Sequence, residues 1–298
     1  MADETLLILL VALAADWKFG EPSWLWSRLP HPVVLFGRAI GWLDNNFNLE
    51  SDDDGARYRK GAVGISALII TSVLAGLLLH GIFLYQNIFT GTGVNLGFFD
   101  AGALVTWTIL LLLLISALSK PVENLGILLL PLAAVMIILD IRFHTSHFLS
   151  ADAPWGLRVH VLISLLAYSL LAMASVQSIL LAVQDHHLRH RHPGGFIRSL
   201  PPLQTMEALL FEMIGAGFVL LTLALLSGFM FLEDMFAQRL AHKTVLSIAA
   251  WIVFGSLLWG RFKSGWRGQK ALIWTLTGFV VLMLAYFGSK FVLELVLS

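Results

Sequence analysis

The sequence contains no cysteine and little charge. The absence of cysteine excludes disulfides, thiolate metal sites and iron–sulfur clusters, so histidine, carboxylate and methionine side chains remain as possible metal ligands. Only 13% of the 298 residues are charged, whereas 58% are hydrophobic, and the mean hydropathy is +0.82. This composition excludes a soluble globular enzyme.

An excess of charge of one sign is also missing. The 19 Lys and Arg residues balance the 19 Asp and Glu residues, so no net basic field is available to bind nucleic acid, and nucleic acid is not expected as a partner. The chain contains no P-loop, nucleophile elbow, HExxH motif or dinucleotide fingerprint. We therefore assign no catalytic residue and favour a role without catalysis.

Long apolar runs are what the sequence does contain. A bilayer core about 30 Å thick needs about 20 apolar helical residues. Seven stretches qualify, at 61–87, 101–118, 124–139, 159–184, 213–232, 245–260 and 271–296. An eighth run, 5–15, would extend only about 16 Å as a helix, and whether it crosses stays open. The sequence predicts an all-α polytopic membrane protein with seven or eight transmembrane helices, for which the lipid bilayer is one partner.

The distribution of Lys and Arg predicts the orientation of these helices. Most basic residues fall in segments that alternation places on one side, including 57–60, 189–198 and 261–270. Cytoplasmic loops are enriched in Lys and Arg, so this side is predicted to be the cytoplasm. The loops at 88–100, 140–158 and 233–244 and the C-terminus are then external.

Five of the ten histidines are predicted to lie toward the external side. His80 lies about 27 Å along its apolar helix from the inner end, and His160 opens a helix that descends from outside, so the two rings share a depth. Two such rings could hold a haem iron axially. The alternative is that each is an interhelical hydrogen-bonding group. His144, His147 and His242 lie in the outer loops, while the His-rich run 186–192 is either a divalent metal site or, as we favour, a solvated cytoplasmic loop.

Short motifs follow one another in a fixed order from about residue 79 to the end. They include Leu79-His80-Gly81, Asn95-Leu96-Gly97-Phe98-Phe99, Lys120-Pro121-Val122-Glu123-Asn124-Leu125, Arg158-Val159-His160 with Ala167-Tyr168, Gly265-Trp266-Arg267-Gly268, and Ala285-Tyr286-Phe287-Gly288-Ser289-Lys290. On these residues the chain resembles the cytochrome c assembly (CcsA-type) family of haem-handling membrane proteins, in its YpjD-like branch.

This resemblance implies haem binding or trafficking at the outer face of the bacterial cytoplasmic (inner) membrane. His160 matches the membrane histidine of the family. We accordingly predict a non-covalent haem b with His80 and His160 as metal ligands, and His242, Arg158 and Lys243 as further binding residues, the two cations pairing with the propionates. Other cytochrome assembly membrane proteins are possible partners. Haem-delivering members of the family carry a Trp-rich outer loop, but the 233–244 segment has no Trp.

The first 60 residues carry a different set of motifs: Ala15-Asp16-Trp17-Lys18-Phe19-Gly20-Glu21-Pro22, Pro30-His31-Pro32-Val33-Val34 and Gly37-Arg38-Ala39-Ile40-Gly41-Trp42-Leu43-Asp44. They resemble the amino-terminal region of the cobinamide-phosphate synthase (CbiB-type) family of corrinoid-pathway membrane proteins. We therefore expect an amino-terminal segment over 1–60, made of a short apolar helix and a cytoplasmic loop, and a cytochrome c assembly-like helical domain over 61–298.

Two alternatives to haem handling remain open at this point. One is a corrinoid-pathway enzyme of the cobinamide-phosphate synthase type, in which Asp16, Glu21 and His31 would be site residues. The other is a transporter or a partner subunit without chemistry of its own.

Overall fold

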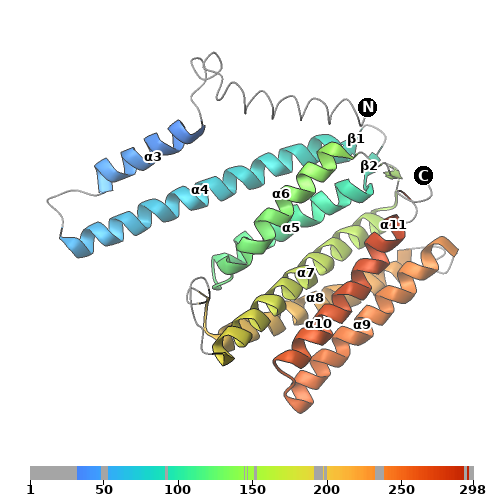
Figure 1. Cartoon of the computed structure of the whole chain (residues 1–298). Helices are drawn as coiled ribbons and strands as arrows, with labels where there is room; N and C mark the ends of the chain where they lie inside the picture. The colour runs from blue at the N-terminus through green and yellow to red at the C-terminus, as the bar shows by residue number, and fades with distance from the viewer. Residues whose placement is uncertain are drawn as a thin grey trace, which may run out of the picture. The chain divides into compact units, whose positions relative to one another are not determined.

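The computed structural model describes residues 32–47, 53–90, 93–143, 145, 147–150, 153–190, 197, 200–231, 238–291 and 294, and these are overwhelmingly helical (Figure 1). The chain divides into two compact units, residues 1–75 and 76–298. The division falls inside one long helix, α4 (Asp54–Ile88).

The first unit contains α3 (Pro32–Phe47) and the first part of α4. Pro32 occupies the first helical position, where its missing N–H costs no hydrogen bond. The Leu43 side chain of α3 lies against Gly64 of α4. We expected the segment of α3 to be a loop, but it forms a helix. Arg38 and Asp44 interrupt its apolar pattern, so the search for apolar runs did not detect it. The apolar run 5–15 lies outside the described residues.

The second unit begins with the last turns of α4 and contains most of the helices. They are α5 (Phe98–Ala117), the 3₁₀ turn η1 (Glu123–Leu125), α6 (Gly126–Arg142), α7 (Trp155–Arg189), α8 (Leu203–Phe231), α9 (Gln238–Ser264), α10 (Gln269–Met283), the π-helical turn η3 (Leu284–Gly288) and α11 (Ser289–Phe291). Seven helical spans in the described part of the chain are long and apolar enough to cross a membrane, and they coincide with the seven predicted runs. The predicted fold class is confirmed.

Several helices extend beyond the apolar runs because their charged ends are paired. Helix α8 starts ten residues before the predicted run, at Leu203. In this extension Glu207 accepts from Arg261 Nη1 at 2.5 Å, and Glu212 forms an ion pair with Lys120. A prediction that ends each helix at the first charged residue therefore makes the helix too short.

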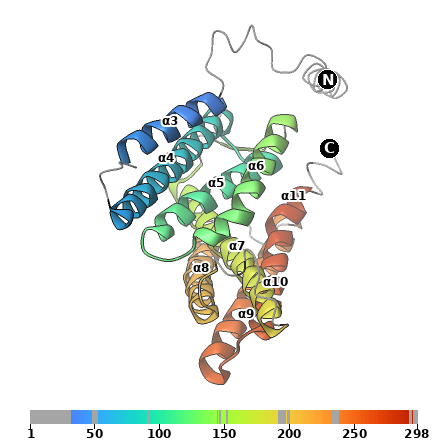
Figure 2. The ribbon, with the colours of Figure 1, turned by 60° about the vertical axis from the view of Figure 1, so that its left-hand side comes forward.

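The most extensive helix contact in the second unit is that of α7 with α8, and α7 also packs on α5 and α10 (Figure 2). The centre of this bundle is filled by large, fully buried side chains: Leu171, Met173, Met206, Leu210, Ile214 and Phe254. Large apolar side chains also cover the outside, among them Leu78, Ile138 and Met230. Helices surrounded by lipid are expected to carry apolar residues both in the centre of the bundle and on its outside.

A small sheet that the sequence did not predict joins two helix connections, the one between α4 and α5 and the one between α6 and α7. Strands β1 (Phe89–Thr90), β2 (Gly93–Asn95) and β3 (Phe148–Ser150) are antiparallel, in the order β1-β2-β3. Val94 pairs with Phe89 on one side and with Leu149 on the other. The sheet thus holds the end of α4, the start of α5 and the α6–α7 connection at one end of the second unit. This is the end that the charge pattern predicts to be external.

Candidate functional site

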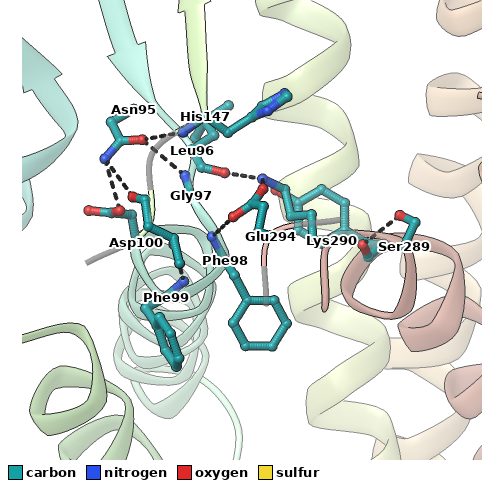
Figure 3. Close-up of polar contacts among 12 residues, drawn as sticks. Asn95, Leu96, Gly97, Phe98, Phe99, Asp100, His147, Ser289, Lys290 and Glu294 are labelled. Carbon is teal, nitrogen blue, oxygen red and sulfur yellow. Dashed lines mark hydrogen bonds and ion pairs between the residues drawn. The ribbon is translucent and has the colours of Figure 1, made fainter. Parts of the chain in front are cut away.

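Asn95 is the centre of a hydrogen-bond network where β2 runs into α5 (Figure 3). Its Oδ1 accepts from the backbone N–H groups of Gly97 at 3.2 Å and His147 at 2.9 Å. Its Nδ2 donates to Asp100 Oδ2 at 2.9 Å and to the Thr145 carbonyl at 3.3 Å. All four hydrogen-bonding positions of the amide are used. One side chain therefore fixes the start of α5 to the connection after α6.

Lys290 and Glu294 attach the C-terminal helix to the same place. Lys290 Nζ donates to the Leu96 carbonyl and lies 3.2 Å from Glu294 Oε1 (Figure 3). Glu294 Oε2 accepts from the Phe98 N–H at 2.7 Å. This N–H is one of the donors that a helix N-terminus leaves without an intrahelical partner. The ion pair therefore also caps α5.

Gly97 is part of this network through its N–H, and its position has no room for a side chain. A Cβ there would overlap with the carbonyl of Thr145, whose Oγ1 accepts from the Phe99 N–H at 3.4 Å. The Asn-Leu-Gly-Phe-Phe motif thus combines a saturated amide with a glycine at a close backbone approach.

His80 is buried in the second unit, with 5% of its surface exposed. Two residues near it on α4 contact α5, since Trp107 Nε1 donates to the Leu77 carbonyl at 2.9 Å and the indole lies against Gly81. Neither ring nitrogen of His80 has a hydrogen-bond partner. A buried imidazole without partners is costly, so this ring is available to a ligand.

His160 is half-buried in the second turn of α7. Its Nδ1 lies 3.0 Å from Ser227 Oγ of α8, and this hydroxyl also donates to the Ala224 carbonyl at 3.0 Å. The hydrogen bond at Nδ1 fixes the ring orientation and leaves Nε2 for another partner. Metal-binding histidines are held in the same way, through the nitrogen that does not bind the metal.

The structure does not place His80 and His160 against a common neighbour. Gly81, next to His80, lies against Trp107 of α5, whereas His160 contacts Ser227 of α8. Helix α5 packs on α7, and its Trp107 contacts the last turns of α4. His80 lies eight residues before the end of α4, and His160 lies five residues after the start of α7. Their shared depth in a membrane stays a prediction.

The other predicted residues lie around the same end of the bundle. Arg158 and His242 are exposed, and Lys243 is half-buried near the start of α9. Partial burial, followed by the positive charges of Lys290 and Lys243, lowers the pKa of His147. Lys290 and Lys243 therefore both place positive charge near His147. His144 lies outside the described residues.

Aromatic rings connect the middle of α7 with the start of α5. The Tyr168 ring lies 5.4 Å from that of Phe279 and 5.7 Å from that of Phe287. The Phe287 ring in turn lies 5.4 Å from that of Phe98. These rings form an apolar wall on the side of α7 that packs on α10.

The donor set limits which iron group the described residues fit. Among them, no cluster of three or more His, Asp or Glu side chains could hold a metal ion. Haem needs only one or two protein ligands, because its macrocycle supplies four nitrogens. Imidazoles with a free nitrogen, such as those of His80 and His160, fit this requirement.

Sequence reasoning missed Asp100, Asp140 and Glu294 as parts of this region and gave Lys290 no role. The pair Lys290 and Glu294 was visible as the two charges near the end of the last apolar run, four positions apart on a helix. Asp140 lies 40 positions from Asp100, and no local pattern links them.

Comparison with known proteins agrees with both resemblances. The family model described as cytochrome C assembly protein matches residues 68–297. The inner membrane protein YpjD of Escherichia coli K12 is 33% identical over 78% of this chain and 89% of its own length. The cytochrome c biogenesis protein CcsA of Trieres chinensis is 23% identical over 93% of this chain and 96% of its own. No solved structure matches the chain.

The amino-terminal similarity extends beyond the 60 residues that we expected. The CobD/CbiB family model matches residues 9–124 and so overlaps with the other match. The cobalamin biosynthesis protein CobD of Sinorhizobium sp is 48% identical over 28% of this chain, but this is only 26% of its own length. The match over 68–297 and the YpjD relative, together with the seven apolar helices, show that this multi-pass membrane protein belongs to the cytochrome c assembly protein family.

Proposed function

We propose that this protein binds one haem b non-covalently, at the outer face of the bacterial inner membrane, and handles it in cytochrome assembly. In this proposal His160 is one axial ligand of the iron and His80 is the other. The outer-face location rests on the positive-inside rule.

The proposal rests on the hydrogen bonding of the two imidazole rings, His80 and His160. His80 is buried with both nitrogens unpartnered, and His160 is oriented through Nδ1 with Nε2 left over. Both lie in the segment that the family model matches. An interhelical hydrogen-bonding role explains the Ser227 contact of His160 but leaves His80 without an explanation.

Other residues of the chain would hold the rest of the group. The wall of Tyr168, Phe279 and Phe287 offers aromatic surface to a flat apolar ring. Lys243 and Arg158 are the cations that we expect to pair with the propionates, because charge-assisted hydrogen bonds to carboxylates are strong. His242 is exposed beside Lys243 and would lie at the edge of the haem site. When bound, the haem supplies a redox-active iron.

Helix α5 sets the condition that this proposal must meet. It contacts the last turns of α4 through Trp107 and packs on α7, so a single iron bound by both rings requires that α5 and α7 separate locally near His160. The hydrogen bond of His160 to Ser227 keeps that ring on the α8 side in the structure. Haem binding by variants that lack His80 or His160 tests whether the two rings bind the same iron.

The test is the Soret absorbance per protein of the full chain, purified in detergent from cells supplied with haem. His160→Ala should lose most of the haem, and His80→Ala should lose an axial bond and give a high-spin spectrum. His190→Ala is the matched control, because His190 is exposed near the opposite end of α7. Full haem content in both single variants would contradict the assignment. If His144→Ala, His147→Ala or His242→Ala loses the haem instead, the ligands lie in the outer loops.

The overlap with CobD relatives does not carry a second proposal. This chain covers 26% of the length of the Sinorhizobium protein, so most of that protein has no counterpart in the match. Asp16, Glu21 and His31, which would serve a corrinoid site, lie outside the described residues.

A further inference from the structure

An acidic cavity of about 410 Å³ lies within the second unit, between the ends of three helices. Its polar lining consists of Asn87 from α4, Asn95 from β2, Asp100 from α5, Asp140 from α6 and Thr145 from the following connection. The cavity is partly open to the surface. Among the described residues that line it, none is cationic.

Asp140 gives the first indication that the cavity holds a ligand. It is 5% exposed, and its Oδ2 is buried without a hydrogen-bond partner. Burial of an ionised carboxylate costs several kcal/mol unless a cation, a metal ion or hydrogen bonds compensate it. The side chain of Arg142, two positions along, lies over the Phe143 ring instead, 5.4 Å from its centroid.

Asp100 adds a second carboxylate at 6% exposure. Its Oδ2 accepts from Asn95 Nδ2 at 2.9 Å. Because Asn95 Oδ1 already accepts two backbone N–H groups, the amide cannot turn to offer its oxygen to the cavity. Asn95 therefore holds Asp100 in place. No hydrogen bond within the described part of the chain fixes the other lining amide, that of Asn87, so its oxygen can turn toward the cavity.

The helix ends reinforce the negative potential of the cavity. Asp140 lies in the last turn of α6, which ends at Arg142, and Asn87 lies in the last turn of α4, which ends at Ile88. The C-terminal end of a helix carries a partial negative charge and favours cations there. The third helix end is the N-terminus of α5, whose partial positive charge is offset by Asp100 in its first turn. Two carboxylates and two helix C-termini thus converge on one space. The anionic propionates of a haem would be repelled from it, so this is not the site proposed above.

We propose that this cavity binds a hard divalent cation, Ca²⁺, with Asp100 and Asp140 as the charged ligands and the Asn87 amide oxygen as a neutral one. Ca²⁺ takes six to eight oxygen ligands in flexible geometry, and water reaches the remaining positions through the open side. With only two carboxylates the affinity should be weak, with a Kd of about 0.1–1 mM, as in extracellular calcium modules. The bound ion would link the ends of α4, α5 and α6.

The test uses the thermal unfolding of the full chain in detergent, followed by the fluorescence of its ten tryptophans. Ca²⁺ up to about 10 mM should raise the unfolding temperature and saturate, because an ion that binds only the folded state stabilises it. Mg²⁺, which demands a stricter octahedral geometry, should raise it less. Choline chloride at equal ionic strength measures the effect of salt alone. The same response is expected from haem-free protein, which separates this test from that of the proposed function.

Matched variants assign the response to the cavity. Asp140→Asn keeps the shape of the side chain and should abolish the Ca²⁺ response, and Asp100→Asn should weaken it at least tenfold. Glu123→Gln removes an exposed carboxylate at the other end of α6 and should leave the response unchanged. Titration calorimetry with CaCl₂ on each folded variant gives a second measure. No saturable response in the unmodified protein, or an equal response in Asp140→Asn, contradicts the proposal. If Asp140→Asn raises the unfolding temperature and Ca²⁺ has no effect, a bound proton compensates Asp140 instead.

Discussion

Replacement of Lys290 by Met tests whether one buried ion pair attaches the C-terminal helix to the start of α5. Lys290 is 5% exposed, and it contacts both the Leu96 carbonyl and Glu294. Met has a similar length and no charge, so the substitution removes the ammonium group with little change in volume. Glu294 then keeps its contact with the Phe98 N–H at 2.7 Å.

The size of the effect follows from the burial of both partners. The side chains of Lys290 and Glu294 are 6% and 13% exposed. Removal of one member of a buried pair leaves the other charge uncompensated and costs about 3–5 kcal/mol. The double variant Lys290→Met with Glu294→Gln should recover most of this loss, because no charge remains buried and the Gln carbonyl can still accept from Phe98.

The assay is unfolding in mixed detergent micelles with increasing SDS, followed by tryptophan fluorescence. Lys263→Met is the control, because Lys263 is exposed and its Nζ lies 5.7 Å from the centre of the Trp259 ring. It should cost less than about 1 kcal/mol. The reasoning is refuted if Lys290→Met costs no more than Lys263→Met, or if the double variant is less stable than either single variant.

Four further predictions address other parts of the account. Ser227→Ala should weaken haem binding by about 10- to 100-fold, because His160 loses the hydrogen bond that orients it, and a haem titration of purified apoprotein measures this. Gly97→Ala should cost about 1–3 kcal/mol, since its Cβ would overlap with the Thr145 carbonyl, whereas Gly215→Ala, with nothing within 4 Å, should be neutral or mildly stabilising in the same SDS titration. Single cysteines introduced at positions 194 and 298 of this cysteine-free chain should react with an impermeant maleimide from opposite sides of the membrane, and labelling from one side only would show that the helix count is wrong. Expression of the chain in a strain that lacks cobinamide-phosphate synthase should not restore corrinoid synthesis; growth on the corrinoid-dependent medium would make Asp16, Glu21 and His31 site residues.

The spans of the helices were predictable because lipid imposes a simple length requirement on apolar sequence. Their ends were less predictable. Helix α8 continues for ten residues beyond its apolar run because Glu207 and Glu212 are paired with cations from other helices. Such pairs join residues 54 and 92 positions apart, and a window along one segment cannot detect them.

The candidate site shows the same limit. His80 and His160 could be chosen from sequence, because a histidine in an apolar helix stands out. The hydrogen bond of His160 to Ser227 spans 67 positions, and the contacts of Asn95 with His147 and of Lys290 with Leu96 span 52 and 194. The three short strands that bring these segments together have two or three residues each, too few for a periodic signal.

The most direct test of the central proposal is the absorption spectrum of the full chain, purified in detergent from haem-supplied cells and recorded oxidised and reduced. Two histidine ligands should give a low-spin b-type haem, with a Soret band that shifts on reduction and resolved α and β bands, at about one haem per protein. A colourless protein that remains colourless after addition of haem would contradict the proposed function.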